Sequence, residues 1–225
     1  MRISFFRDRI NNSNPANQEI LVGNISAKWQ GILNEFPMAG LVFQGLRRDE
    51  QGQIVVSRED VFATDDMEQR IIKALIWGYP KGMQGTRNLQ NIIANMAYIV
   101  QQVQQYKDGA LVRNRFLALC RNLYAVSGLK QSTLGKILYF CDVSVGQNQA
   151  IIVDANVLGA FECFDDFYGV SYESDPAERY YSQITKINAV ARAQQVNPDQ
   201  IEFFLFNLGK AWKQEKTDFL NDYRR

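Results

Sequence analysis

The chain contains no histidine among its 225 residues. This absence excludes catalytic triads built on histidine, zinc sites of the His-Glu-x-x-His type and histidine general bases. Any catalysis must therefore use aspartate, glutamate, lysine, tyrosine, serine or cysteine side chains.

Cysteine is scarce, with only Cys120, Cys141 and Cys163, each in an apolar helical context. An odd number of such residues argues against a disulfide framework. The three are also too scattered along the sequence for an iron–sulfur cluster. We therefore expect no metal and no cofactor.

Long apolar runs are missing as well. No stretch approaches the roughly 20 residues that span a membrane, and the first residues, MRISFFRDRINN, lack the pattern of a secretory signal. The sequence thus predicts a cytoplasmic protein with no membrane partner.

The chain has little net charge. Its 25 lysine and arginine residues nearly balance 24 aspartate and glutamate residues, which leaves a formal charge of +1. No field from the whole molecule would draw it to nucleic acid, so any such binding must depend on a local basic patch. Strong, salt-dependent non-specific binding is not expected.

The length and the 46% hydrophobic content suit one globular domain. We predict a single domain over residues 1–225. Residues 1–63 form an irregular, β-containing N-terminal part, and residues 64–225 form a helical body.

The N-terminal part carries three local signals. Residues 1–24 look like an irregular lead-in, and Ser26 can cap a helix that runs to Phe36. The apolar runs Leu41–Val42–Phe43 and Ile54–Val55–Val56 flank a polar turn and predict a small β-hairpin.

The rest of the chain shows apolar residues at helical spacing, interrupted by capping residues, glycine and proline. The fold class is therefore mainly α. The expected helices cover residues 64–77, 88–107, 110–127, 132–141, 154–165, 175–195 and 198–222.

One stretch, residues 111–164, combines several of these signals. A helix ends at Ser127–Gly128, and a second one starts at Ser132 or Thr133, whose side-chain oxygens can cap it. A short apolar run, Ile151–Ile152–Val153, then leads to Asp154 at the start of a third helix, where an N-cap belongs.

This arrangement resembles the helix-hairpin-helix DNA glycosylases, most closely bacterial proteins with the 8-oxoguanine DNA glycosylase fold. The matching residues are Ser127-Gly128-Leu129-Lys130-Gln131-Ser132-Thr133-Leu134, followed by Ile151-Ile152-Val153-Asp154. The segment Trp77-Gly78-Tyr79-Pro80-Lys81-Gly82 looks like one in a branch associated with bacterial anti-phage defence. The resemblance implies a helix-hairpin-helix glycosylase-like fold, with the β-hairpin as an N-terminal decoration.

The resemblance gives Asp154 a catalytic role. A glycosylase needs a carboxylate near the sugar, either to activate water or to stabilise positive charge as the base leaves. The alternative is a plain helix cap that contributes about 1 kcal/mol. Both roles can hold at once.

The family's other catalytic group is a lysine whose amine forms a Schiff base with the deoxyribose. Alignment on the hairpin places Ser132 at that position, whereas counting back from Asp154 favours Lys136. Because loops change length more readily than a turn and its following helix, we follow the hairpin. A serine there resembles the monofunctional members, and Lys136 could instead be a solvated lysine.

The resemblance also implies how the chain would hold DNA. The hairpin of this fold grips phosphate through backbone N–H groups, so Gly128 and Lys130 are candidate contacts. Lys130 stands where the family has a second glycine. Lys81 and Arg87 form a basic loop and are the other candidates.

Three residues are candidates for the base pocket. Glu202 and Phe206 share a helix face in a segment that resembles the base-reading segment of 8-oxoguanine glycosylases. Trp77 is a candidate stacking group, with Tyr79 as an alternative. Aromatic residues at helical spacing are otherwise typical of a core.

The leading function is a glycosylase-like protein that recognises a modified purine in nucleic acid and cleaves its N-glycosidic bond. The alternative is a catalytically inactive binding module, or a protein-interaction scaffold in a defence complex. The expected partner is nucleic acid, specifically DNA, and protein partners are expected under the alternative of a defence complex.

Overall fold

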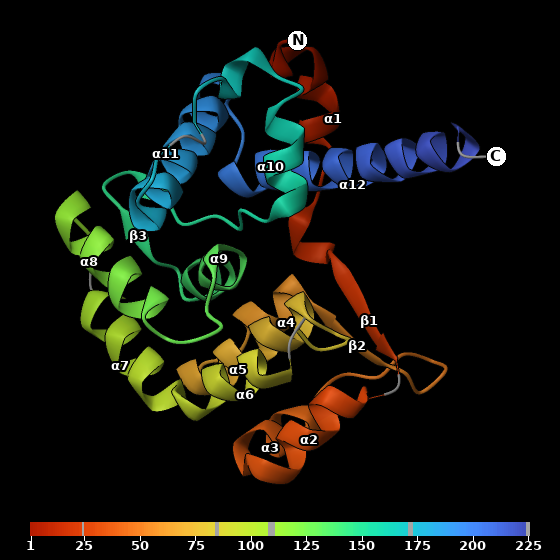
Figure 1. The fold of residues 1–225 in the computed structure, drawn as a ribbon, viewed down its shortest axis with the longest axis vertical. Helices are drawn as coiled ribbons and strands as arrows, with labels where there is room; N and C mark the ends of the chain where they lie inside the picture. Colours follow the sequence, from red (N-terminus) through yellow and green to blue (C-terminus); the bar gives the residue numbers. More distant parts are fainter. Residues whose placement is uncertain (24, 84–85, 108–110, 171–172, 224–225) are drawn as a thin grey trace. The chain divides into compact units, whose positions relative to one another are not determined.

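The computed structural model describes residues 1–23, 25–83, 86–107, 111–170 and 173–223. These residues form two compact units: unit 1, Met1–Pro15 with Ile151–Arg225, and unit 2, Ala16–Ala150. Within the described ranges the structure has 12 α-helices and little strand, so the mainly α prediction is confirmed (Figure 1). None of the helices described here could cross a membrane, being too short or too polar.

Unit 2 contains the predicted small antiparallel sheet. Strand β1 (Glu19–Gly23) pairs with β2 (Ile54–Ser57), with Glu19 opposite Ser57 and Leu21 opposite Val55. The predicted partner strand, Leu41–Val42–Phe43, was wrong, because these residues lie in helix α3 (Pro37–Gln44). The predicted irregular lead-in was wrong in part, since it supplies β1.

Two of the first helices of unit 2 begin at residues whose side chains cap them. Ser26 Oγ accepts a hydrogen bond from the Trp29 amide at the start of α2 (Ala27–Glu35), as predicted. Ser57 and Asp60 form a reciprocal capping box on α4 (Arg58–Phe62).

Helix α5 (Met67–Gly78) follows α4, and Asp66 caps it. The single helix predicted over residues 88–107 is two helices, α6 (Thr86–Ala94) and α7 (Met96–Lys107). Between them, the Asn95 side chain donates to the Asn91 carbonyl at 2.7 Å. Asparagine side chains compete in this way for backbone groups, which interrupts a helix.

Helices α8 (Arg113–Tyr124) and α9 (Gln131–Phe140) flank the predicted hairpin. Every residue from Thr133 to Phe140 is buried, so α9 is the central helix of unit 2. It packs on α5 and α8. Its N-cap is Lys130, without a side-chain hydrogen bond, so the predicted capping by Ser132 or Thr133 was wrong. The small strands β3 (Ser144–Val145) and β4 (Asn148–Gln149) follow.

Unit 1 is built around the long helix α12 (Pro198–Tyr223), on which α1 (Arg7–Asn11), α10 (Ala155–Phe161) and α11 (Pro176–Gln194) pack (Figure 1). The helices α10 and α12 approach closely at Gly209, where a Cβ would lie 2.0 Å from the Asn156 carbonyl oxygen. Only glycine therefore permits this crossing of α10 and α12.

Two 3-10 helices also belong to unit 1, η1 (Ile3–Phe6) and η3 (Asp165–Phe167). A third, η2 (Pro15–Asn17), starts at the last residue of the N-terminal part of unit 1. The single-domain organisation stays a prediction.

Candidate functional site

Ser132 and Lys136, the two candidate positions for the catalytic lysine of the hairpin motif, are in contact on α9. The Lys136 amine donates to the Ser132 hydroxyl at 2.7 Å and approaches the Ser132 carbonyl oxygen at 3.3 Å. Lys136 is only 5% exposed, so it is not the solvated lysine that was the alternative. Its amine therefore lies beside the residue that the hairpin alignment had selected.

The stem of Lys136 passes over the last residue of α5. A Cβ built on Gly78 would lie 2.5 Å from both Cδ and Cε of the lysine. Real Cβ atoms do not approach other atoms so closely, so a glycine at this position leaves the channel through which Lys136 reaches Ser132.

An aromatic ring covers the amine. The Lys136 Nζ lies 4.9 Å from the centroid of the Tyr79 ring. In the described part of unit 2, no carboxylate forms an ion pair with this nitrogen. The amine is thus surrounded by a hydroxyl, a carbonyl oxygen and a π-face.

Tyr79 is itself fixed by two hydrogen bonds. Its hydroxyl lies 2.7 Å from Thr133 Oγ1 on α9, and its carbonyl oxygen accepts the Trp29 indole N–H at 2.9 Å. Four residues later, the Met83 carbonyl accepts the Lys28 amine at 2.7 Å. Helix α2 therefore holds the segment that carries Tyr79.

The hairpin has a backbone geometry that requires glycine. Gly128 has a φ of +90°, and a Cβ there would lie 2.8 Å from the Cα of Asn88 on α6. Lys130 is exposed at the start of α9, and Lys81 and Arg87 are also exposed. All three cations can meet solvent ligands, and their roles in binding stay predictions.

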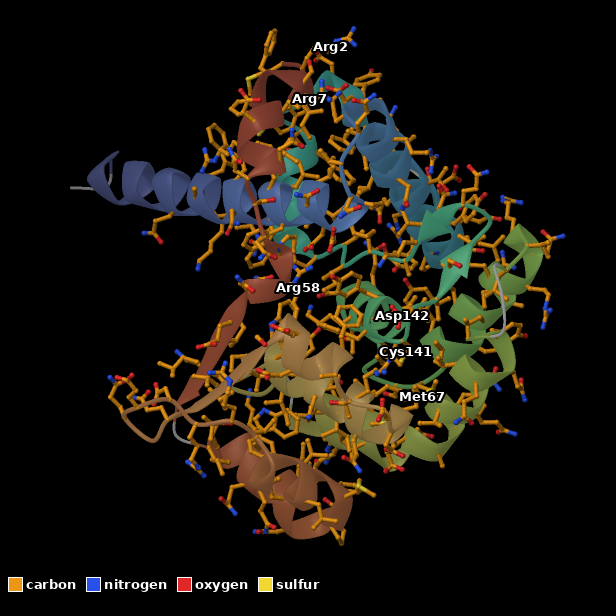
Figure 2. All side chains as sticks on the ribbon, turned by 180° about the vertical axis from the view of Figure 1, so that it is seen from behind. Arg2, Arg7, Arg58, Met67, Cys141 and Asp142 are labelled. Atoms are coloured by element: carbon orange, nitrogen blue, oxygen red, sulfur yellow. The ribbon has the colours of Figure 1, made fainter. Side chains whose placement is uncertain are left out.

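Trp77 lies in the core of unit 2. It is 6% exposed, its indole N–H donates to the Gln18 carbonyl at 3.2 Å, and its ring meets Phe140 edge-on. The guanidinium of Arg58, which Figure 2 labels, lies 5.2 Å from the centroid of the same ring. To stack on a base, Trp77 would first have to be uncovered.

In unit 1, Asp154 is the predicted N-cap of α10. Its Oδ1 accepts hydrogen bonds from the amides of Asn156 and Val157 at 2.8 and 3.0 Å. Oδ2 makes no hydrogen bond with any described residue, and the side chain is half-buried. Capping therefore leaves one carboxylate oxygen available for chemistry.

The other pocket candidates lie on α12. Glu202 is 1% exposed and Phe206 is half-buried. A small cavity of about 110 Å³ opens on a neighbouring face of this helix. Neither candidate lines it; the lining residues are Arg9, Ser13, Phe203, Phe204, Asn207 and Leu208.

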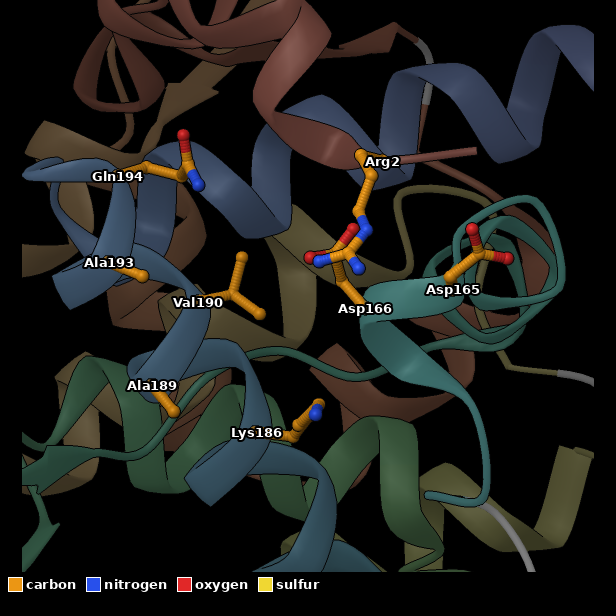
Figure 3. A pocket seen from close by; sticks show the side chains of 8 residues that line it. All are labelled: Arg2, Asp165, Asp166, Lys186, Ala189, Val190, Ala193 and Gln194. Atoms are coloured by element: carbon orange, nitrogen blue, oxygen red, sulfur yellow. The ribbon is translucent and has the colours of Figure 1, made fainter.

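A second cavity in unit 1, of about 350 Å³, contains none of the predicted site residues (Figure 3). Arg2, Asp165, Asp166 and Lys186 are its charged lining residues, and the Asp166 carboxylate accepts the Ile3 amide at 2.8 Å. No group of metal-ligating side chains occurs in the ranges that the structure covers.

A comparison with protein-family models matches residues 19–206 to the family described as "Putative 8-oxoguanine DNA glycosylase OGG-like protein". The chain belongs to this OGG-like family. No curated protein and no solved structure matches it. The OGG-like region includes the hairpin, the Lys136–Ser132 pair, Asp154 and the Glu202–Phe206 segment, and it starts with β1.

The geometry adds two residues to the surroundings of Lys136 in this OGG-like protein that the sequence pattern did not assign to it. Gly78 was noted only as part of a motif, and Tyr79 only as an alternative stacking group. The Gly-Tyr-Pro segment was the available signal, but its distance of more than 50 residues from Lys136 hid the contact. In chemical terms, a buried amine held by a hydroxyl and a ring can act as a nucleophile.

Proposed function

We propose that this OGG-like protein cleaves the N-glycosidic bond of a purine-like base in DNA, with Lys136 as the nucleophile. The observation that carries the proposal is the buried amine of Lys136, 2.7 Å from Ser132 Oγ at the start of the hairpin's second helix. The sequence alignment favoured a monofunctional enzyme with Ser132 in place of the lysine. The contact between the two side chains favours the amine, oriented by the hydroxyl.

The covalent step conserves atoms and charge. The lysine nitrogen attacks C1′, the bond from C1′ to the base breaks, and its electron pair leaves with the base. The C1′–O4′ bond then opens as a C1′=N iminium forms on the lysine. An ammonium loses two protons in this sequence, and the departing base and O4′ take up one each.

Asp154 is proposed as the carboxylate of the reaction. Its Oδ1 is committed to the α10 amides, which fixes the side chain, and its Oδ2 accepts no hydrogen bond from a described residue. A fixed carboxylate can stabilise positive charge that develops on the sugar, or accept a proton.

Exposed cations are proposed to hold the DNA backbone. Lys130, Lys81 and Arg87 would supply phosphate contacts without sequence preference, and Gly128 in the hairpin would add its backbone N–H. Glu202 and Phe206 remain the proposed base-pocket residues of unit 1. Trp77, in the core of unit 2, remains a separate candidate for stacking on a base. A modified guanine as the target, and a role in anti-phage defence, follow only from the resemblance of the Trp77–Gly82 segment.

The test is a panel of oligonucleotides that carry guanine, 8-oxoguanine, deazaguanine or an abasic site, each at two salt concentrations. Excision and borohydride trapping of a protein–DNA adduct are measured for the wild type and for Lys136→Ala. Lys210→Ala, a change of an exposed lysine on α12, is the matched control. We expect an adduct that is lost only in Lys136→Ala; a flat result across the panel supports the scaffold reading instead.

A further inference from the structure

The Tyr79 ring faces the atom that would carry positive charge in the proposed reaction. Its centroid lies 4.9 Å from Lys136 Nζ, within the roughly 6 Å over which an aromatic face attracts a cation. Lys136 is buried, and among the described residues of unit 2 it has a hydroxyl, a carbonyl and this ring as polar neighbours. Together with the two oxygens, the ring is therefore placed to interact with a cation on this nitrogen.

The ring is also held in place before any substrate binds. The Thr133 hydroxyl fixes one end of the tyrosine at 2.7 Å, and the Trp29 indole fixes its carbonyl at 2.9 Å. Thr133 is buried on the same helix as Lys136, so the ring and the amine share one frame. A preorganised group stabilises developing charge without reorganising during the reaction.

We propose that Tyr79 is a catalytic residue whose aromatic face stabilises the iminium on Lys136. The inference rests on the proposed role of Lys136 as nucleophile. The iminium nitrogen stays cationic from its formation until hydrolysis or elimination, so a π-face at this distance lowers the energy of the intermediate and of the step that forms it. Loss of the ring's electrostatic attraction should slow adduct formation about tenfold.

A tyrosine at this position could also act only through packing, and the experiment must separate the two roles. Fluorine atoms on a phenylalanine ring weaken its negative face while they change its shape little. Tyr79 is therefore replaced by phenylalanine, and then by phenylalanine with one, two and three ring fluorines. The probe is an oligonucleotide with an abasic site, whose aldehyde forms the same iminium without excision of a base.

The single-turnover rate of borohydride trapping is measured across this series. We expect the logarithm of the rate to fall stepwise with each fluorine, to a total of about tenfold, while the melting temperature stays constant. The matched control is the same series at Phe62, whose ring contacts Tyr139 and Phe140 in unit 2 and should not affect trapping.

Three outcomes separate the hypotheses. A stepwise fall at position 79 and none at position 62 supports the role of Tyr79. A flat series, with trapping that Lys136→Ala abolishes, overturns the role of Tyr79 and leaves the proposed nucleophile standing. Trapping that persists in Lys136→Ala, or is absent in the wild type, overturns the proposed nucleophile and the role of Tyr79 with it.

Discussion

Gly78→Ala should slow the reaction of Lys136 while it leaves the stability of unit 2 almost unchanged. The added methyl group would lie 2.5 Å from Cδ and Cε of Lys136, whereas carbon atoms in contact are about 3.5 to 4.0 Å apart. The lysine stem must therefore move by about 1 Å or more. Because it is a flexible side chain, it can move without disrupting the backbone.

The effect on stability should be small. Gly78 is the last residue of α5 and has no positive φ, so alanine fits the backbone there. Alanine in a helix is favoured over glycine by up to about 1 kcal/mol, which offsets part of the cost of moving the lysine. We expect the free energy of unfolding to change by about 1 kcal/mol or less.

The effect on chemistry should be large. A reacting group that is misplaced by about 1 Å can lose about a hundredfold in rate. The assay is single-turnover trapping with an abasic-site oligonucleotide, measured beside thermal unfolding. Gly31→Ala is the matched control, because it lies in α2 of the same unit and a Cβ there meets no atom within 4 Å. If Gly78→Ala is trapped at the wild-type rate with an unchanged melting temperature, the Lys136 side chain does not pass over Gly78 as described.

Three further predictions concern other residues. Asp154→Asn should abolish excision and leave the melting temperature within a few degrees, since the amide oxygen can still cap α10; lower stability with unchanged excision would make it only a cap. Lys130→Ala should weaken binding equally for all sequences and reduce the slope of log affinity against log salt by roughly 0.7 to 0.9. A salt titration in which Lys130→Glu leaves both the affinity and the slope unchanged would contradict this prediction. Burial raises the pKa of Asp60, but hydrogen bonds from the Ser57 amide and hydroxyl, together with the positive charges of Arg47 and Lys73, outweigh it, and the pKa lies below its usual value. The ionised carboxylate should therefore stabilise the fold above about pH 4, and this stabilisation should be lost as the pH falls further. The urea-unfolding midpoint of the wild type should decrease over that range, and the midpoint of Asp60→Asn should decrease less.

Much of the helical body followed from local signals in the sequence. The caps Asp66, Asp154 and Asp175 and the helices behind them lie where a short polar residue precedes a periodic apolar segment. The sheet was harder, because Ile54–Val56 pairs with a strand more than 30 residues earlier. A short apolar run such as Leu41–Val42–Phe43 fits a helix as well as a strand, and only its packing decides.

In the candidate site, too, local contacts could be predicted from the sequence and long-range contacts could not. Ser132 and Lys136 lie four residues apart on one helix, so helical geometry alone predicts that they can touch. The contacts of Lys136 with Gly78 and Tyr79 join segments that are distant in the sequence and depend on how α5 packs on α9. No local pattern could have shown them.

The most direct test of the central claim is the identity of the residue that is trapped on DNA. The protein is incubated with an abasic-site oligonucleotide and borohydride, digested, and the modified peptide is sequenced by mass spectrometry. We predict one secondary-amine adduct, on Lys136, and its loss in Lys136→Ala. An adduct on another residue, or none in the wild type, would contradict the claim that the buried amine beside Ser132 is the nucleophile.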